Sequence, residues 1–243
     1  IILKMDELLK KLNEEQIKPV CDTEGAVLVL AGAGSGKTRV LTSRIAYILE
    51  NGLASPRQIL AITFTNKAAA EMKERVRLVC GDTDDMWICT IHSMCVRILK
   101  RYTSEAGIKP DFSIYSETER KNIIKKCLKE LDYDDEKMLK NCKYHIGNAK
   151  MLGLEPDQYA RRYADENKID DYVRVYRQYE EHLKENNALD FDDLLLYARR
   201  LLLRDEEVRT YLSDRFKYVL VDEFQDTNAV QYDIIKLLTK VHG

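Results

Sequence analysis

Short apolar runs of strand length alternate with amphipathic stretches of helix length between Val27 and Ser104. The runs cover Val27–Leu30, Ile59–Phe64 and Trp87–Thr90, and the stretches that follow them cover Lys37–Glu50, Asn66–Val79 and His92–Ser104. Asn51-Gly52 and Gly81 are expected to end the first two helices. Strands that alternate with helices in this way predict an α/β fold, in which helices cover both faces of a parallel sheet.

Between Ser116 and Asp214 the periodicity is helical throughout, and the segment is rich in Lys, Glu, Asp and Tyr. Asp190 has the properties of an N-cap, with Asp193 in the first turn of the helix that it begins. An apolar strand then returns at Tyr218–Val221, and a helix over 228–240 follows it. The chain is therefore predicted to be an α/β domain (1–110 and 214–243) interrupted by an all-helical insertion (111–213). Breaks between helices of the insertion are expected at Gly147, Gly153, Pro156 and Asn186-Asn187.

A glycine-rich loop separates the first predicted strand from the first predicted helix. It reads Ala31-Gly32-Ala33-Gly34-Ser35-Gly36-Lys37-Thr38. Glycines let backbone N–H groups turn toward a phosphate, and the helix N-terminus adds more N–H groups and its positive dipole end. Lys37 would reach the outer phosphates of a nucleoside triphosphate, and the Thr38 hydroxyl would bind Mg²⁺. The alternative is a flexible loop before an ordinary helix; the preceding strand and the amphipathic helix favour the phosphate site.

Two acidic residues, Asp222 and Glu223, directly follow the returning strand. Ligands of open α/β sheets lie beyond the carboxyl ends of the strands, so this pair and the glycine loop are predicted to meet. Asp222 would hold Mg²⁺, directly or through water, and Glu223 would orient and polarise the attacking water. Two exposed acids at a strand end are an equal alternative when taken alone; together with the loop they predict ATP hydrolysis.

The overall composition restricts the class of protein but not its ligand. With a net charge of −2, contact with nucleic acid has to come from a local basic patch. Six cysteines without C-x-x-C spacing or a His/Cys cluster indicate reduced, mostly buried thiols of a cytoplasmic protein. No apolar stretch approaches the ~20 residues that a membrane span needs.

From Val221 to Asn228 the sequence Val-Asp-Glu-Phe-Gln-Asp-Thr-Asn resembles the second motif of superfamily 1 DNA helicases of the UvrD/PcrA/Rep type. The resemblance extends from Leu8 to Leu238. It implies a first RecA-like ATP-binding subdomain (1A), with the helical insertion as the accessory subdomain (1B). Further matches occur in the family's order: Leu12–Gln16 (Q motif), Ala31–Thr38 (phosphate loop), Thr63–Ala69 (motif Ia), Thr90–Ser93 (motif Ib, with Ile91 where Phe is common) and Leu189–Leu194 (a further block).

The resemblance also implies roles for single residues. Gln16 would contact adenine, and Arg39 would join residues 31–38 in holding the triphosphate and Mg²⁺. Without the resemblance, Gln16 is a solvated helix residue, Phe64 a core aromatic at a strand end, and His92 a helix residue bonded to backbone. Gln225 would couple the nucleotide to the DNA, or cap the final helix. The residues that would face single-stranded DNA are Phe64, Thr65, Asn66, Lys67 and His92.

The implied activity is that of an ATP-dependent helicase that moves 3′ to 5′ along single-stranded DNA toward a duplex junction. In that family a second RecA-like domain, absent from these residues, supplies arginines to the γ-phosphate. The chain alone is thus expected to bind ATP–Mg weakly, to hydrolyse it at a trace rate and not to unwind DNA. A strand that normally enters the sheet is also absent, which predicts a gap there, a repair by another chain, or the remainder of the protein present as a separate fragment. The alternatives are the helicase part of a helicase–nuclease, a non-catalytic nucleotide-gated DNA-binding module and, less consistent with Phe224–Asn228, a small-molecule kinase.

Overall fold

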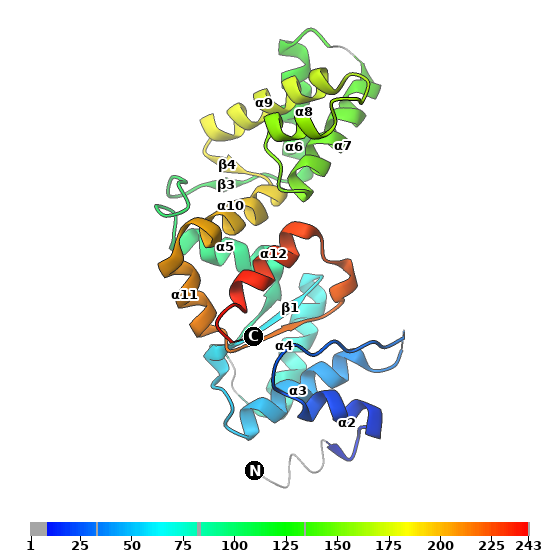
Figure 1. The fold of residues 1–243 in the computed structure, drawn as a ribbon, viewed down its shortest axis with the longest axis vertical. Helices are drawn as coiled ribbons and strands as arrows, with labels where there is room; N and C mark the ends of the chain where they lie inside the picture. The colour runs from blue at the N-terminus through cyan, green and yellow to red at the C-terminus, as the bar shows by residue number, and fades with distance from the viewer. Residues whose placement is uncertain (1–8, 33, 82–83, 134, 243) are drawn as a thin grey trace. The chain divides into compact units, whose positions relative to one another are not determined.

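The computed structural model describes residues 9–32, 34–81, 84–133 and 135–242 of the chain. Its contacts divide the chain into two compact units, one with residues up to 94, 206–227 and from 235 on, the other with residues 95–205 and 228–234. The first unit carries a three-stranded parallel sheet, and the second is mostly helical (Figure 1). The α/β class with a parallel sheet is therefore confirmed, whereas the domain boundaries given above remain predictions. Within the described ranges, no helix is long and apolar enough to cross a membrane.

Three parallel strands form the sheet of the first unit, in the order β2-β1-β5. β1 (Ile59–Thr63) is central and buried along its whole length, β2 covers Trp87–Thr90 and β5 covers Tyr218–Val221. Ile62 is level with Cys89 on one side and with Val221 on the other. The predictions for these three strands are confirmed, including the return of a late strand to the sheet.

The helices in the early part of the chain match the predicted amphipathic stretches. α3 covers Lys37–Glu50, α4 covers Asn66–Cys80 and α5 covers Ile91–Arg101. Gly81, with φ +83°, ends α4, as predicted for a residue that needs the left-handed region. The core between α3, α4 and the sheet contains Ile45, Ile48, Ile59, Met72, Val76 and Leu220. The remaining elements are α2 (Glu14–Cys21), η1 (Pro56–Gln58), α11 (Glu206–Arg215), η2 (Phe224–Asp226) and the last helix, α12 (Ala229–Leu238).

The predicted strand Val27–Leu30 is wrong. These residues have no regular secondary structure, and Leu28 and Leu30 are 67% and 87% exposed. A strand needs a neighbour that accepts and donates its backbone hydrogen bonds. Among the described strands none pairs with this run, since the sheet consists of β2, β1 and β5. The apolar sequence is thus insufficient without a pairing partner.

Five described helices lie wholly within the second unit, which also includes most of α5 and α12: α6 (Glu117–Glu130), α7 (Glu136–Met151), α8 (Pro156–Arg162), α9 (Ile169–Glu185) and α10 (Phe191–Arg204). Their apolar faces enclose a core that includes Ile124, Cys142, Ile146, Tyr159, Tyr176 and Tyr179. The prediction that this region contains helices only is wrong, because β4 (Ala188–Leu189) pairs in parallel with β3 (Ser113–Ile114). Two residues are too few to show a strand pattern in the sequence.

The predicted helix break at Gly147 is also wrong, because α7 continues through it to Met151. A Cβ on Gly147 would lie 3.3 Å from Nη2 of Arg120, which belongs to α6. Glycine therefore provides room for a guanidinium from a neighbouring helix. The other expected breaks fall between helices: Gly153 precedes α8, Pro156 begins it, and Asn186-Asn187 follow α9.

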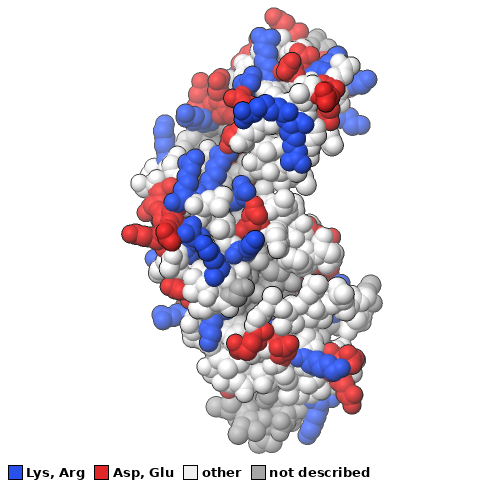
Figure 2. Space-filling view, viewed as in Figure 1, with Lys and Arg blue, Asp and Glu red and all other residues white. Residues whose placement is uncertain are grey.

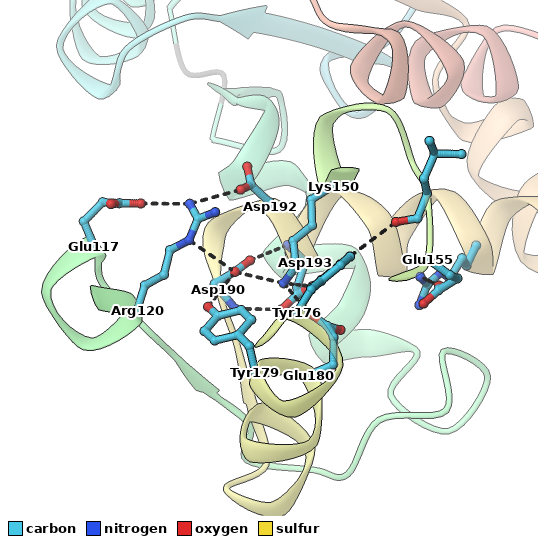
Figure 3. A network of polar contacts seen from close by, with 12 residues as sticks. Glu117, Arg120, Lys150, Glu155, Tyr176, Tyr179, Glu180, Asp190, Asp192 and Asp193 are labelled. Carbon is cyan, nitrogen blue, oxygen red and sulfur yellow. Dashed lines mark hydrogen bonds and ion pairs between the residues drawn. The ribbon is translucent and has the colours of Figure 1, made fainter. Parts of the chain in front are cut away.

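Charged side chains are buried at the centre of the helical unit (Figure 3). Lys150 on α7 has no exposed side-chain surface, and its Nζ lies 2.8 Å from Glu180 Oε1, 2.9 Å from Asp190 Oδ2 and 2.7 Å from Asp193 Oδ1. Asp190 and Asp193 form a capping box at the start of α10, which confirms the predicted N-cap. The Tyr179 hydroxyl donates to Asp190 Oδ2 (2.8 Å). One ammonium thus joins α7, α9 and α10.

The charges of this network alter one another's proton affinity. Burial alone would lower the pKa of Lys150, but the carboxylates of Asp193, Glu180 and Asp190 raise it well above its ordinary value. Burial opposes the ionised form of Asp190 as well, yet the Lys150 ammonium lowers the pKa of that carboxyl. For Asp193, burial dominates and raises the pKa well above its usual range. Lys150 therefore stays charged, and its ammonium lowers the pKa of Asp190 and opposes the rise in the pKa of Asp193.

Candidate nucleotide site and nucleic-acid surface

The glycine loop turns sharply before α3. Gly34 and Gly36 have φ values of +76° and +88°, which a residue with a Cβ adopts only under strain. Gly36 is the N-cap of α3. The Ser35 N–H and hydroxyl both donate to the Gly32 carbonyl, at 3.3 and 2.7 Å. Ala33, predicted to bind the cofactor, lies outside the described residues. The loop thus places Lys37 at the first position of the helix, with the first turn's N–H groups beside it.

Lys37 and Glu223 lie in contact although 186 positions separate them. The distance from Lys37 Nζ to Glu223 Oε2 is 3.3 Å, and about a third of each side chain is exposed. This contact arises because β5 pairs with β1, so that the two acids emerge from the carboxyl end of the sheet; the Asp222 N–H donates to the Ile62 carbonyl (2.9 Å). The predicted convergence of the loop lysine and the acidic pair is confirmed, whereas the roles of these residues remain predictions.

Glu223 has an uncommon backbone conformation, and its side chain accepts two hydrogen bonds. Its φ of +51° lies in the left-handed region, which is uncommon for a residue other than glycine. Nε2 of Gln225 donates to the same Oε2 that contacts Lys37. These two hydrogen bonds, Gln225 first, hold the pKa of the Glu223 carboxyl below its usual value. Burial and the neighbouring Glu223 charge raise the pKa of Asp222.

Gln16 belongs to this site through the phosphate loop. Its Nε2 donates to the Ser35 carbonyl at 2.8 Å, and its Oε1 accepts from the Asn13 N–H at 3.1 Å. The alternative of a solvated helix residue is therefore wrong. The contact with Ser35 could not be predicted from the sequence, because residue type and spacing do not tell which backbone carbonyl an amide will reach. Thr38 is half-buried in the first turn of α3, and Arg39 beside it is exposed, as is Ala31 in the loop.

The residues predicted to face DNA lie at the carboxyl ends of β1 and β2. These strands end level with each other at Thr63 and Thr90, and α4 and α5 begin soon after. The Thr65 hydroxyl accepts from the Ala68 N–H (3.1 Å) and caps α4. Asn66 and Lys67 are exposed in the first turn of α4. Two helix N-termini thus open at the same edge of the sheet, where their N–H groups favour anions.

The two candidate stacking residues differ in exposure. Phe64 is 61% exposed, so the alternative of a core aromatic is wrong. His92 lies in the first turn of α5 and is half-buried, and burial lowers the pKa of its imidazole. In the face shown in Figure 2, Lys and Arg gather over α5 and α10, with acidic residues among them. A local concentration of basic residues therefore exists in a chain whose net charge is −2.

Comparison with known proteins agrees with the motifs and the geometry. The family model of the UvrD/REP helicase N-terminal domain matches residues 12–243. The ATP-dependent DNA helicase PcrA of Staphylococcus aureus is 46% identical over 237 residues, which cover 96% of this chain and 32% of that protein. PcrA of Staphylococcus epidermidis is 44% identical with the same coverage. The chain thus spans about a third of the length of the relatives that it matches. From its match over nearly its whole length, the chain belongs to the UvrD/REP helicase N-terminal domain family.

Proposed function

We propose that this chain is the ATP-binding part of an ATP-dependent DNA helicase, with a RecA-like fold in its sheet-bearing unit. The observation that carries the proposal is the 3.3 Å contact between Lys37 Nζ and Glu223 Oε2. It brings a phosphate-binding lysine and a candidate general base to one point beside a glycine loop. The names of the relatives, ATP-dependent DNA helicases, give the same reaction.

ATP hydrolysis would use the side chains at this point in the following way. The Glu223 carboxylate accepts a proton from a water molecule while the water oxygen attacks the γ-phosphorus. The bond from the γ-phosphorus to the bridging oxygen breaks, and ADP and phosphate result. Lys37 balances the charge of the outer phosphates. Gln225 and Lys37 lower the pKa of Glu223, so its carboxylate is ionised and can accept a hydrogen bond from that water.

Mg²⁺ fits the donor atoms that the site offers. Thr38 provides a hydroxyl and Asp222 a carboxylate, and Mg²⁺ prefers such oxygen ligands together with water and phosphate oxygens. Burial raises the pKa of Asp222, and the neighbouring Glu223 charge raises it further; a nearby dication would favour the ionised carboxylate. The described part of the chain has no cluster of three or more His, Cys, Asp or Glu suited to a metal, so the ion would depend on the nucleotide for further ligands. When bound, it would neutralise charge on the phosphates.

Single-stranded DNA would lie across the carboxyl ends of β1 and β2. Phe64 and His92 offer flat rings for stacking on bases, which tolerates any sequence. Asn66, Lys67 and the capped start of α4 at Thr65 offer donors to a phosphate. Gln225 donates a hydrogen bond to Glu223, the candidate base. A movement of Gln225 caused by DNA binding would therefore move the Glu223 carboxylate in the nucleotide site. The 3′ to 5′ direction, the duplex junction and the need for a second RecA-like domain follow from the resemblance alone.

The nucleotide proposal is tested by titrating the chain with ATP in MgCl₂ in a calorimeter. Lys37→Ala should weaken binding at least about tenfold, because a charge-assisted contact with phosphate is lost. Lys73→Ala is the matched control: Lys73 lies on α4 and pairs with Asp84 (3.5 Å), and its removal should leave the affinity unchanged. Equal affinity of the wild type and Lys37→Ala would contradict the proposal.

The DNA proposal is tested by the fluorescence anisotropy of labelled oligo-dT over a series of salt concentrations. Lys67→Ala should reduce the slope of log affinity against log salt by about one phosphate contact. Lys73→Ala, on the same helix, serves again as the control. If neither variant changes the slope, the proposal that Lys67 of motif Ia contacts a DNA phosphate is contradicted.

A further inference from the structure

Both the nitrogen and the oxygen of the Gln16 amide form hydrogen bonds with the chain itself. Its Nε2 donates to the Ser35 carbonyl (2.8 Å), and its Oε1 accepts from the Asn13 N–H (3.1 Å). Ser35 immediately precedes the Gly36-Lys37 step at which the loop becomes α3. The bond therefore links a helix near the start of the chain to the last turn of the phosphate loop.

Gly36 and Gln16 fit against each other. A Cβ on Gly36 would lie 3.0 Å from Gln16 Nε2, a tight contact at which the amide would have to give way slightly. Gly32 and Gly34 would meet no atom within 4 Å. Among the described glycines of the loop, Gly36 is thus the one at which an added Cβ would meet another part of the protein. The atom that it would meet first is the amide nitrogen of Gln16.

The helix that carries Gln16 is itself anchored on α3. Leu12, Val20 and Val40 form a small buried cluster between α2 and α3. The guanidinium of Arg44, on α3, donates to the carbonyls of Pro19 and Asp22 at the end of α2. Gln16 therefore projects from a helix, α2, whose position is fixed by its contacts with α3. α3 is also the helix that follows the phosphate loop.

We propose that Gln16 is a positioning residue for the phosphate loop. By holding the Ser35 carbonyl, its amide fixes the turn at Gly36 and so the placement of Lys37. The inference rests on the proposed function, because it presumes that the loop binds phosphates. It differs from the adenine contact that the family resemblance gives to Gln16, since it predicts an effect on a ligand that has no base.

Inorganic tripolyphosphate with MgCl₂ is the probe, with ATP alongside it, both titrated into the chain by calorimetry. Gln16→Met has a similar size and no hydrogen-bonding amide, and should raise the Kd for tripolyphosphate about fivefold, as expected for one lost hydrogen bond. Asn13→Ala is the matched control. It removes the side chain that caps α2 by accepting from the Gln16 N–H (2.9 Å) and leaves the amide donor in place. Its Kd should stay within about twofold of the wild type.

A second variant keeps the test independent of the folding of Gln16→Met. Gln16→Glu retains an acceptor for the Asn13 N–H but cannot donate to the Ser35 carbonyl, so it should also weaken tripolyphosphate binding. The loss should persist at 1 M salt, where the added charge is screened. Circular dichroism verifies the helix content of each variant.

Three results would overturn the inference. If Gln16→Met and Gln16→Glu bind tripolyphosphate like the wild type but bind ATP more weakly, Gln16 serves the base alone. If Asn13→Ala loses as much affinity as Gln16→Met, the effect belongs to the helix cap. If the wild type binds neither ligand, the proposed nucleotide site fails and the inference falls with it.

Discussion

Replacing Lys150 by Met should cost the chain about 3–5 kcal/mol of unfolding free energy at neutral pH, the range for breaking a buried ion pair from one side. The methionine fills a similar volume, so the loss comes from charge rather than from a cavity. Asp190 and Asp193 are 2% and 3% exposed at their side chains, and both would lose an ammonium that lies within 3 Å. Water cannot reach them to replace it, and the capping box of α10 depends on both.

The matched control lies on the same helix. Lys143 pairs with Glu117 at 3.1 Å, but its side chain is 35% exposed and that of its partner 64%. Exposed ion pairs contribute little to the free energy of unfolding, so Lys143→Met should lower it by less than about 1 kcal/mol. Urea unfolding followed by far-ultraviolet circular dichroism measures both variants, and hydrogen exchange should show the loss of protection in α7, α9 and α10. Equal losses for the two methionine variants would refute the reasoning.

The pH dependence supplies a second check. Without the ammonium, the buried carboxylates have raised pKa values and take up protons more readily in the folded chain than in the unfolded one. A raised folded pKa removes stability as the pH rises, so the cost of Lys150→Met should be largest at pH 8 and should shrink toward pH 5. Adding Asp193→Asn should recover part of the loss at pH 8, because one unpaired charge disappears while an acceptor oxygen remains.

Three further outcomes follow from the same structure. Gly36→Ala should weaken ATP binding more than tenfold in a calorimetric titration, because its φ of +88° and the 3.0 Å contact both oppose a Cβ. Phe64→Ala should weaken oligo-dT binding by ~1–3 kcal/mol at any salt concentration, while Leu78→Ala, at a 74% exposed position of α4, should not, as read by anisotropy. Burial lowers the pKa of His145, whose ring stacks on Tyr172 at 4.2 Å. Stability should therefore fall as the pH drops below about 6.5, the unfolded value, and His145→Gln should flatten that dependence in urea melts.

Elements that depend on local sequence could be predicted, and elements that depend on a distant partner could not. The bounds of α3, β2 and β5 follow from periodicity, glycine stops and short apolar runs, all of which act within a few residues. Val27–Leu30 has the same apolar character as β5 but pairs with none of the strands that the structure describes. Gly147 looks like a helix break until the guanidinium that fills its space is known.

The candidate site shows the same division. The meeting of Lys37 and Glu223 could be predicted, because both follow from the rule that ligands lie at the carboxyl ends of parallel strands. The bond from Gln16 to Ser35 could not, since any of several carbonyls lies within reach of a glutamine. The burial of Lys150 could not be predicted from the sequence either, because a lysine among polar helix residues ordinarily lies in solvent.

The uncovered run before the phosphate loop has a consequence for anyone who handles this chain at high concentration. Ala26–Ala31 has no Pro, Gly or charge, and no charged side chain stands between Glu24 and Lys37. Six residues of this kind match the composition of segments that stack into cross-β fibrils, and Leu28 and Leu30 are largely open to solvent. Storage at low concentration, or a lysine introduced at Val29 as a gatekeeper, would protect preparations against self-assembly through this stretch.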